Sequence, residues 1–220
     1  MIEYYLDIFE KTKCEHSLAA PQNISCRFSE SDFPEGLEPM WYRVINTQRS
    51  PREKAMAFMW HNAKTLNVCS IMEDSDVHTG AAGKNDRTWA KGDVMELFIQ
   101  APNARNYYEL HVAPNMATLE LSIPDVSVMG KVKLEELFFE SGFTSSLNLF
   151  NLKSGIKGWL GHMKIPLDKI GLSSGKLTGS RFAVCRYNYN HLWVEGPEIS
   201  STSYFPAGGF HQPDFWQNII

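Results

Sequence analysis

Polar and aromatic side chains share one face of two successive strand-like stretches, and side chains of these types can form a ligand-binding surface. In the first stretch, Glu96 lies on the same face as Phe98, whereas the alternate positions are apolar. In the second, Tyr107, Glu109 and His111 alternate with apolar neighbours. Successive side chains of a strand point to opposite faces. We therefore expect one face in the core and the other, with its acids and histidine, available to a ligand.

Two tryptophans stand where an indole ring can be exposed beside such polar groups. Trp89 lies at a loop–strand junction before Glu96, and Trp193 follows a strand end close to Asn190. Flat aromatic rings and planar hydrogen-bonding groups suit sugars, which present apolar C–H faces and hydroxyls. Alternatively, either ring caps one end of the fold. The other tryptophans are expected in the core: Trp41, Trp60, Trp159 and Trp216.

The elements that position these residues are mainly β-strands. Residues 55–62 and 65–74 predict a hairpin, and strand patterns recur at 158–166 and 181–189. Turn signals between many strands favour an all-β fold, a two-sheet antiparallel β-sandwich of immunoglobulin-like or jelly-roll type. Three further segments are interpreted as a strand over 3–9, a short inserted helix near 131–141, and a C-terminal tail over 210–220 that packs back on the body.

Composition narrows the classes of protein that this chain can be. The 220 residues are 43% hydrophobic and contain no linker or repeat, which predicts a single domain over 1–220, with 1–40 as an irregular extension packed on it. A net charge of −4 without a basic stripe argues against nucleic acid as a partner. No apolar run reaches the ~18–20 residues of a membrane span. The first ten residues do not resemble a signal peptide, so the expected location is cytoplasmic unless a signal has been removed; the oligomeric state is open.

The cysteines fit no paired metal-binding pattern, and buried free thiols are expected. An exported chain could bridge Cys14 and Cys26, and a metal group of Cys14, His16 and Cys26 would offer only three ligands. The remaining cysteines, Cys69 and Cys185, lie inside strand-like runs. No cofactor is expected, except that Glu73, Asp74 and Asp76 could hold a structural calcium ion or be ordinary solvated turn acids.

Enzyme motifs are not found: the sequence contains no GxSxG, HExxH, Walker A or GxGxxG pattern. Glycoside hydrolysis needs only two suitably separated carboxylates, and Glu96 and Glu109 are the candidates if they face each other on neighbouring strands. They could equally pair with Arg186 and have a structural role. A glycoside hydrolase, or an accessory domain of one, therefore stays open as an alternative.

Several motifs, taken in order, resemble a known family. The run WAKGDVMELF holds Trp89, Asp93 and Glu96 in the manner of W-x-x-D-x-x-E, with one extra residue after the tryptophan. The runs TLNVCSIMED, YYELHVAP, WLGHMKIPLDKIGL, RFAVCRYNY and FHQPDFW match further strand and terminal patterns, with His162 where an acid is usual. Together, over residues 40–220, the chain resembles the family 9 carbohydrate-binding modules and their DOMON-like relatives.

The resemblance implies a β-sandwich that binds a sugar or glycan chain end without cutting it, in the context of polysaccharide breakdown. In that family two tryptophans clamp the terminal sugar, while a glutamate, an asparagine and basic groups bind its hydroxyls. Carried over to this chain, the ligand-binding residues are Trp89, Glu96, Glu109, His111, Arg186, Asn190 and Trp193. The extra residue after Trp89 could turn that ring away from the site.

Two other classes of function stay open. Some DOMON-like domains bind haem through histidine and methionine, so a haem-binding redox module is an alternative, with His111, His162, Met95 and Met163 as the residues to consider. A structural or protein-binding sandwich is the other. In that case protein would cover the face that carries Glu96, Glu109 and His111.

Overall fold

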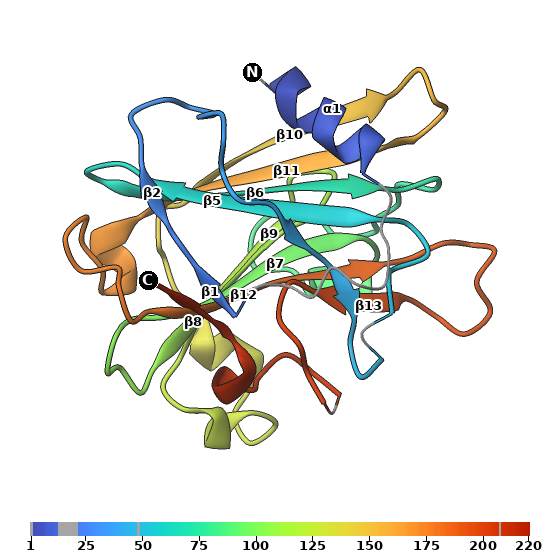
Figure 1. Ribbon diagram of the computed structural model, residues 1–220. Helices are drawn as coiled ribbons and strands as arrows, with labels where there is room; N and C mark the ends of the chain where they lie inside the picture. Colours follow the sequence, from blue (N-terminus) through green and yellow to red (C-terminus); the bar gives the residue numbers. More distant parts are fainter. Residues whose placement is uncertain (1, 13–21, 48, 207) are drawn as a thin grey trace.

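Two β-sheets pack face to face, and a short helix lies outside one of them (Figure 1). The computed structural model describes residues 2–12, 22–47, 49–206 and 208–220. This architecture confirms the predicted β-sandwich. Within these residues, no helix is long and apolar enough to span a membrane.

The first sheet has six strands and is antiparallel except at one edge. The predicted hairpin forms its centre and turns at residues 62–64. The parallel pairing of β2 with β5 makes the sheet mixed. Its strands are, in order, β10 (Thr144–Asn151), β11 (Lys157–Pro166), β6 (Thr65–Glu73), β5 (Ala55–His61) and β2 (Arg27–Phe28), with β3 (Met40–Trp41) also on β5.

The second sheet has eight strands and carries the polar face seen in the sequence. Its central strands are antiparallel, whereas β1 and β14 pair in parallel at one edge. The order is β1 (Asn23–Ile24), β14 (Gln217–Ile219), β12 (Arg181–Asn188), β7 (Val94–Gln100), β8 (Tyr107–Val112) and β9 (Thr118–Ile123), with β13 (Glu198–Ser201) pairing β12 and β4 (Arg43–Val44).

The strand predicted over residues 3–9 is wrong, because Ile2–Lys11 forms the helix α1. Its buried side chains, Tyr5 and Phe9, are four residues apart and lie on one helical face. They pack with Phe58 and Trp60 on the outer face of the six-stranded sheet. The helix therefore adds a third layer to the sandwich, at the top of Figure 1.

The inserted helix predicted near 131–141 is a single 3-10 turn, η3 (Leu134–Leu137). It stops there because the chain then runs along the edge of β9. Leu121 pairs with Phe138, and the amide of Phe139 donates to the carbonyl of Glu120 over 3.0 Å. The turn lies under the eight-stranded sheet, together with η2 (Val126–Val128) (Figure 1).

The main core lies between the sheets and explains the alternation in β7. Met95 and Leu97 point into this core, whereas Glu96 and Phe98 point to the outer face of the eight-stranded sheet. That outer face is partly covered by residues 208–216, termed here the C-terminal segment, through Phe210 and Trp216. The predicted packing of the tail is thus confirmed, and it brings residues far along the chain beside Glu96.

The tryptophans expected in the core are buried there: Trp41, Trp60, Trp159 and Trp216. Cys69 and Cys185 are buried free thiols, as predicted, and Cys26 is a partly buried free thiol. Cys14 and His16, which the alternative bridge and metal group need, lie outside the described residues.

Candidate functional site

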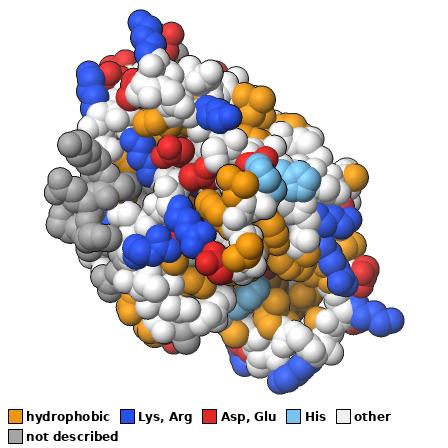
Figure 2. Space-filling view, turned by 90° about the vertical axis from the view of Figure 1, so that its right-hand side faces the viewer, with side chains coloured by type: hydrophobic (Ala, Val, Ile, Leu, Met, Phe, Trp, Pro, Cys, Tyr) orange, Lys and Arg blue, Asp and Glu red, His pale blue; other side chains and the backbone are white. Residues whose placement is uncertain are grey.

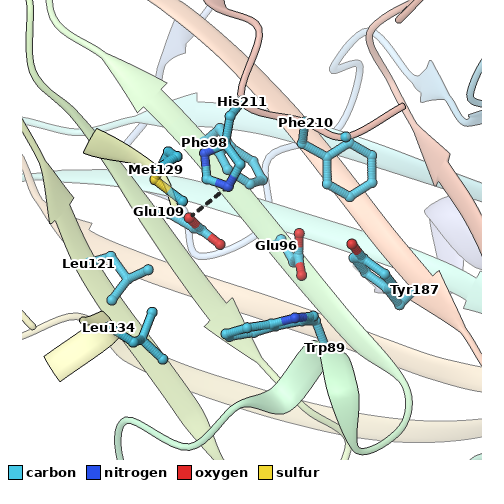
Figure 3. A pocket seen from close by; sticks show the side chains of 11 residues that line it. Trp89, Glu96, Phe98, Glu109, Leu121, Met129, Leu134, Tyr187, Phe210 and His211 are labelled. Carbon is cyan, nitrogen blue, oxygen red and sulfur yellow. Dashed lines mark ion pairs between the residues drawn. The ribbon is translucent and has the colours of Figure 1, made fainter. Parts of the chain in front are cut away.

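A pocket of about 260 Å³ opens on the outer face of the eight-stranded sheet (Figure 3). Strands β7, β8, β9 and β12 form its floor, and the C-terminal segment and the loop that carries η3 form its rim. The pocket combines apolar and aromatic walls with a few polar groups, as ligand pockets usually do. Its lining residues are Trp89, Glu96, Phe98, Glu109, Leu121, Met129, Leu134, Tyr187, Gly209, Phe210 and His211.

Three buried polar side chains meet at the floor of this pocket. Glu96 on β7 faces His111 on β8, and Glu109 lies two residues from His111 on the same face. The His111 Nε2 atom lies 2.8 Å from Glu109 Oε1 and 3.5 Å from Glu96 Oε1. The other ring nitrogen, Nδ1, lies 2.7 Å from the hydroxyl of Thr88. We call Glu96, Glu109 and His111 the floor cluster.

Burial sets the protonation of the floor cluster. The pKa of Glu96 is raised to about 8, mainly by desolvation; His111 opposes this shift and the neighbouring Glu109 adds to it. Desolvation also disfavours a charged His111, but the two carboxylates outweigh it and hold its pKa above the ordinary value. The carboxyl group of Glu96 is therefore mostly protonated at neutral pH, since burial disfavours its charged form.

His211 in the C-terminal segment extends the cluster, although no motif in the sequence marks it as a site residue. Its Nε2 lies 3.7 Å from Glu109 Oε2, and its Nδ1 lies 2.7 Å from the hydroxyl of Tyr107. Burial lowers its pKa. Glu109 Oε2 is buried without a hydrogen-bond partner among the described residues. A hydrogen bond from a ligand atom to such a buried acceptor would be favourable.

Aromatic side chains form the walls, and Trp89 is one of them despite the extra residue that follows it. Trp89 belongs to the 3-10 turn η1 (Thr88–Ala90), and its ring meets that of His111 edge-on at 5.7 Å. The hydroxyl of Tyr189 donates to the Trp89 carbonyl over 2.7 Å and fixes the turn. The opposite wall holds Tyr187 and Phe210, whose rings are 5.7 Å apart. Glu96 lies between the two walls (Figure 3).

Asp93 and Gly92 shape the chain between Trp89 and β7. Asp93 accepts hydrogen bonds from the amides of His78 and Tyr189, over 2.5 and 2.7 Å, and anchors the end of the loop. Gly92 has a φ of +147° and pairs with Thr79 as an isolated bridge. Only a glycine fits there, because a Cβ atom would lie 2.4 Å from the carbonyl oxygen of His78.

We expect Gly92→Ala to destabilise the protein by at least about 2 kcal/mol, since it combines backbone strain with a clash against backbone. Gly83→Ala is the matched control, because Gly83 also has a positive φ, +69°, but a Cβ atom there would meet nothing within 4 Å. The control should cost only about 1–2 kcal/mol. Urea unfolding measures both. Equal losses would show that the loop relaxes around a methyl group at Gly92.

Four residues predicted to bind ligand do not line the pocket: His111, Arg186, Asn190 and Trp193. His111 is fully buried and contacts the lining residues Glu96 and Glu109. Asn190 and Trp193 lie in the loop after β12, where the amide of Asn190 donates to the Ser75 hydroxyl over 3.0 Å. The guanidinium of Arg52 lies over the Trp193 ring at 5.0 Å. The two tryptophans of the expected clamp therefore do not face each other. Asn190 instead lines a shallower pocket of about 330 Å³ with Asp76, His78, Tyr189 and His191.

Arg186 points away from the pocket, toward the side of the sheet that faces the core. Its Nη2 atom donates to Asn188 over 2.7 Å, to the Glu73 carbonyl over 2.8 Å and to Asp74 over 3.3 Å. Arg186 and Asp74 are both fully buried. The guanidinium thereby ties β12 to the end of β6 in the opposite sheet.

The residues behind the calcium and haem alternatives have protein partners. Asp74 also accepts from the Trp159 indole over 3.1 Å, and Asp76 lies 2.6 Å from His191 Nδ1. His162 stacks on Trp60 with ring centroids 5.2 Å apart, and burial lowers its pKa to about 4. Met95 and Met163 are buried between the sheets.

Comparison with known proteins gives structural matches only. No protein-family model matches the sequence, and a search of curated proteins finds no match. Among solved structures, the chain is similar to a protein from Bacteroides uniformis described as a candidate carbohydrate-binding protein, with a TM-score of 0.65, 16% identity, and 90% of this chain and 97% of the other covered.

It is also similar to a family 9 carbohydrate-binding module from Caldicellulosiruptor kristjanssonii. In complex with cellotriose the module gives a TM-score of 0.61 at 11% identity, covering 90% of this chain and 92% of the module. In complex with glucose it gives 0.59 at 9% identity, with 90% and 94% covered. At these identities the likeness establishes a shared β-sandwich fold.

Proposed function

We propose that this protein binds carbohydrate without cleaving it, and that a sugar or glycan chain end enters the pocket on the outer face of the eight-stranded sheet. One observation carries the proposal. Trp89 on one wall and Tyr187 on the other enclose Glu96, and the same pocket is lined by Glu109, whose Oε2 atom has no hydrogen-bond partner among the described residues.

The walls suit the apolar faces of a sugar ring. An indole or phenol ring offers a large flat surface and loses little side-chain entropy on binding. The volume of about 260 Å³ lies just below the ~300–1,000 Å³ of pockets for drug-sized ligands. A pocket of this size accommodates one ring or a chain end, rather than several consecutive residues within a polymer.

The floor suits hydroxyl groups. Glu109 Oε2 is a buried acceptor without a donor in the described part of the chain, and leaving such an atom unpaired costs about 1–3 kcal/mol. A sugar hydroxyl would supply the missing donor. Among the described residues, no lysine or arginine lines the pocket, so an anionic sugar would meet no permanent positive charge there. The pocket should therefore select neutral sugars over uronic acids or sulfated sugars.

The surface charge is compatible with a neutral ligand. On the face drawn in Figure 2, basic and acidic side chains are intermixed, without a continuous patch of either sign. The structural neighbours support a sugar as the ligand, because the Caldicellulosiruptor kristjanssonii module is observed with cellotriose and with glucose. Participation in polysaccharide breakdown is part of the same proposal.

Binding is favoured over hydrolysis by the arrangement of the carboxylates. Retaining glycosidases separate their two carboxyl groups by about 5–5.5 Å, and inverting enzymes by about 6.5–9.5 Å, with the sugar between them. Here one oxygen of Glu96 and one of Glu109 lie within 4.8 Å of each other and of His111 Nε2. Both carboxylates thus contact the same imidazole instead of flanking an open space.

Calorimetry with a panel of sugars tests the proposal. The panel contains neutral mono- and oligosaccharides, the matching uronic acids, and oligosaccharides blocked at one end. We expect at least one neutral sugar to bind, its uronic acid to bind at least tenfold more weakly, and blocking of the recognised end to abolish binding. If no neutral sugar binds at millimolar concentration, the proposed function is wrong.

A further inference from the structure

We infer that the floor cluster, Glu96, Glu109 and His111, is a binding site for a divalent transition-metal ion such as Zn²⁺, with His211 as a fourth ligand from the C-terminal segment. For metal binding, the sequence patterns bring in His111 only as a candidate haem ligand and give no reason for an ion held by Glu96 and Glu109. The inference concerns the metal alone and does not depend on sugar binding.

The donor atoms already converge. One ligand atom from each member of the floor cluster lies within 4.8 Å of the others. Zinc–ligand distances are about 2.0–2.2 Å, so atoms bound to one ion lie about 3–3.5 Å apart. Small side-chain movements would therefore bring the three atoms onto one ion. His211 Nε2, at 3.7 Å from Glu109 Oε2, approaches from the rim.

The two histidines are held in the way that metal ligands are held. A metal-bound histidine usually donates its other ring N–H to an oxygen, which fixes the tautomer and the orientation of the ring. His111 Nδ1 lies 2.7 Å from the hydroxyl of Thr88, and His211 Nδ1 lies 2.7 Å from that of Tyr107. In both rings the Nε2 atom is thereby directed to the carboxylates.

The side chain of Glu109 gives independent evidence for a bound cation. Its side chain is 7% exposed, yet Oε2 has no hydrogen-bond partner among the described residues and points toward His211 (Figure 3). A cation placed there would give this oxygen a partner. With neutral imidazoles, a divalent ion also balances the two carboxylate charges, which are unfavourable in a buried site without compensation.

The chemistry of the donors selects the class of ion. Calcium takes six to eight oxygen ligands, and magnesium prefers oxygen and water. A set of two carboxylates and one or two imidazoles suits zinc and its first-row neighbours instead.

The test uses tag-free protein, treated with a chelator and then dialysed, with Zn²⁺ as the titrant in calorimetry and Co²⁺ in absorption spectroscopy. We expect one equivalent of either ion to bind. Glu109→Gln and His111→Gln should each weaken binding at least tenfold, whereas His162→Gln, a buried histidine in the other sheet, and Glu195→Gln, an exposed acid, should leave it unchanged.

X-ray absorption at the zinc edge uses only the wild-type protein, so its result does not depend on whether the variants fold. It should show nitrogen and oxygen ligands at about 2.0–2.2 Å. The inference is overturned if the wild type binds neither ion, if Glu109→Gln and His111→Gln bind as well as the wild type, or if the spectrum shows sulfur ligands. No sugar is present, so failure here leaves the proposed function untouched.

Discussion

Replacing Arg186 by leucine is expected to lower the free energy of unfolding by about 3–5 kcal/mol. Arg186 and Asp74 form an ion pair in which both side chains are fully buried. Leucine would leave the carboxylate of Asp74 without its cation and the carbonyls of Glu53 and Glu73 without a donor. Urea unfolding followed by tryptophan fluorescence measures the loss.

Arg181→Leu is the matched control, because Arg181 lies on the same strand but pairs with Asp214 at the surface, where the side chains are 44% and 90% exposed. This variant should lose less than about 1 kcal/mol. In Arg186→Leu/Asp74→Leu both charges are removed, so part of the stability should return. If Arg186→Leu costs no more than the control, the guanidinium has no structural role and its predicted ligand role regains support.

The example of Arg186 shows what the sequence could not decide about the site. In β12, Phe182 and Val184 share a face with Arg186, and Ala183 and Cys185 share the other with Tyr187. Both faces are apolar, since each is covered by protein. Period-two alternation therefore could not tell which of Arg186 and Tyr187 faces the pocket. In β7 and β8 the polar residues lie on one face only, and their convergence could be predicted.

Local sequence patterns could not predict that the C-terminal segment contributes His211 to the site, and the reason is a different one. His211 reaches the site by packing on Phe98 and by its contact with Tyr107, which is 104 residues away in the chain. The tail was correctly predicted to pack back, from its aromatic residues, but nothing local specifies the strand it covers. Likewise, Tyr5 and Phe9 fit helix or strand spacing, and packing against the six-stranded sheet selects the helix.

Trp89 and Trp193 are expected to differ strongly in their contribution to sugar binding, although the sequence alone predicts the same role for both. Trp89→Ala is expected to weaken sugar binding by about 10- to 100-fold, because truncation of an aromatic side chain that anchors a ligand costs about 2 kcal/mol or more. Trp193→Ala is expected to leave binding unchanged, because Trp193 lies against Arg52 and outside the pocket. Calorimetry with the tightest-binding sugar of the panel measures both.

The opposite pattern would relocate the site. If Trp193→Ala abolishes binding and Trp89→Ala does not, the sugar binds at the loop after β12, beside Asn190 and His191, as the family resemblance implies for the second tryptophan. If both variants lose affinity, that loop must close over the pocket when ligand is present, since Trp193 does not line the pocket in this structure. Loss in Trp89→Ala alone places recognition between Trp89 and Tyr187, above the floor cluster.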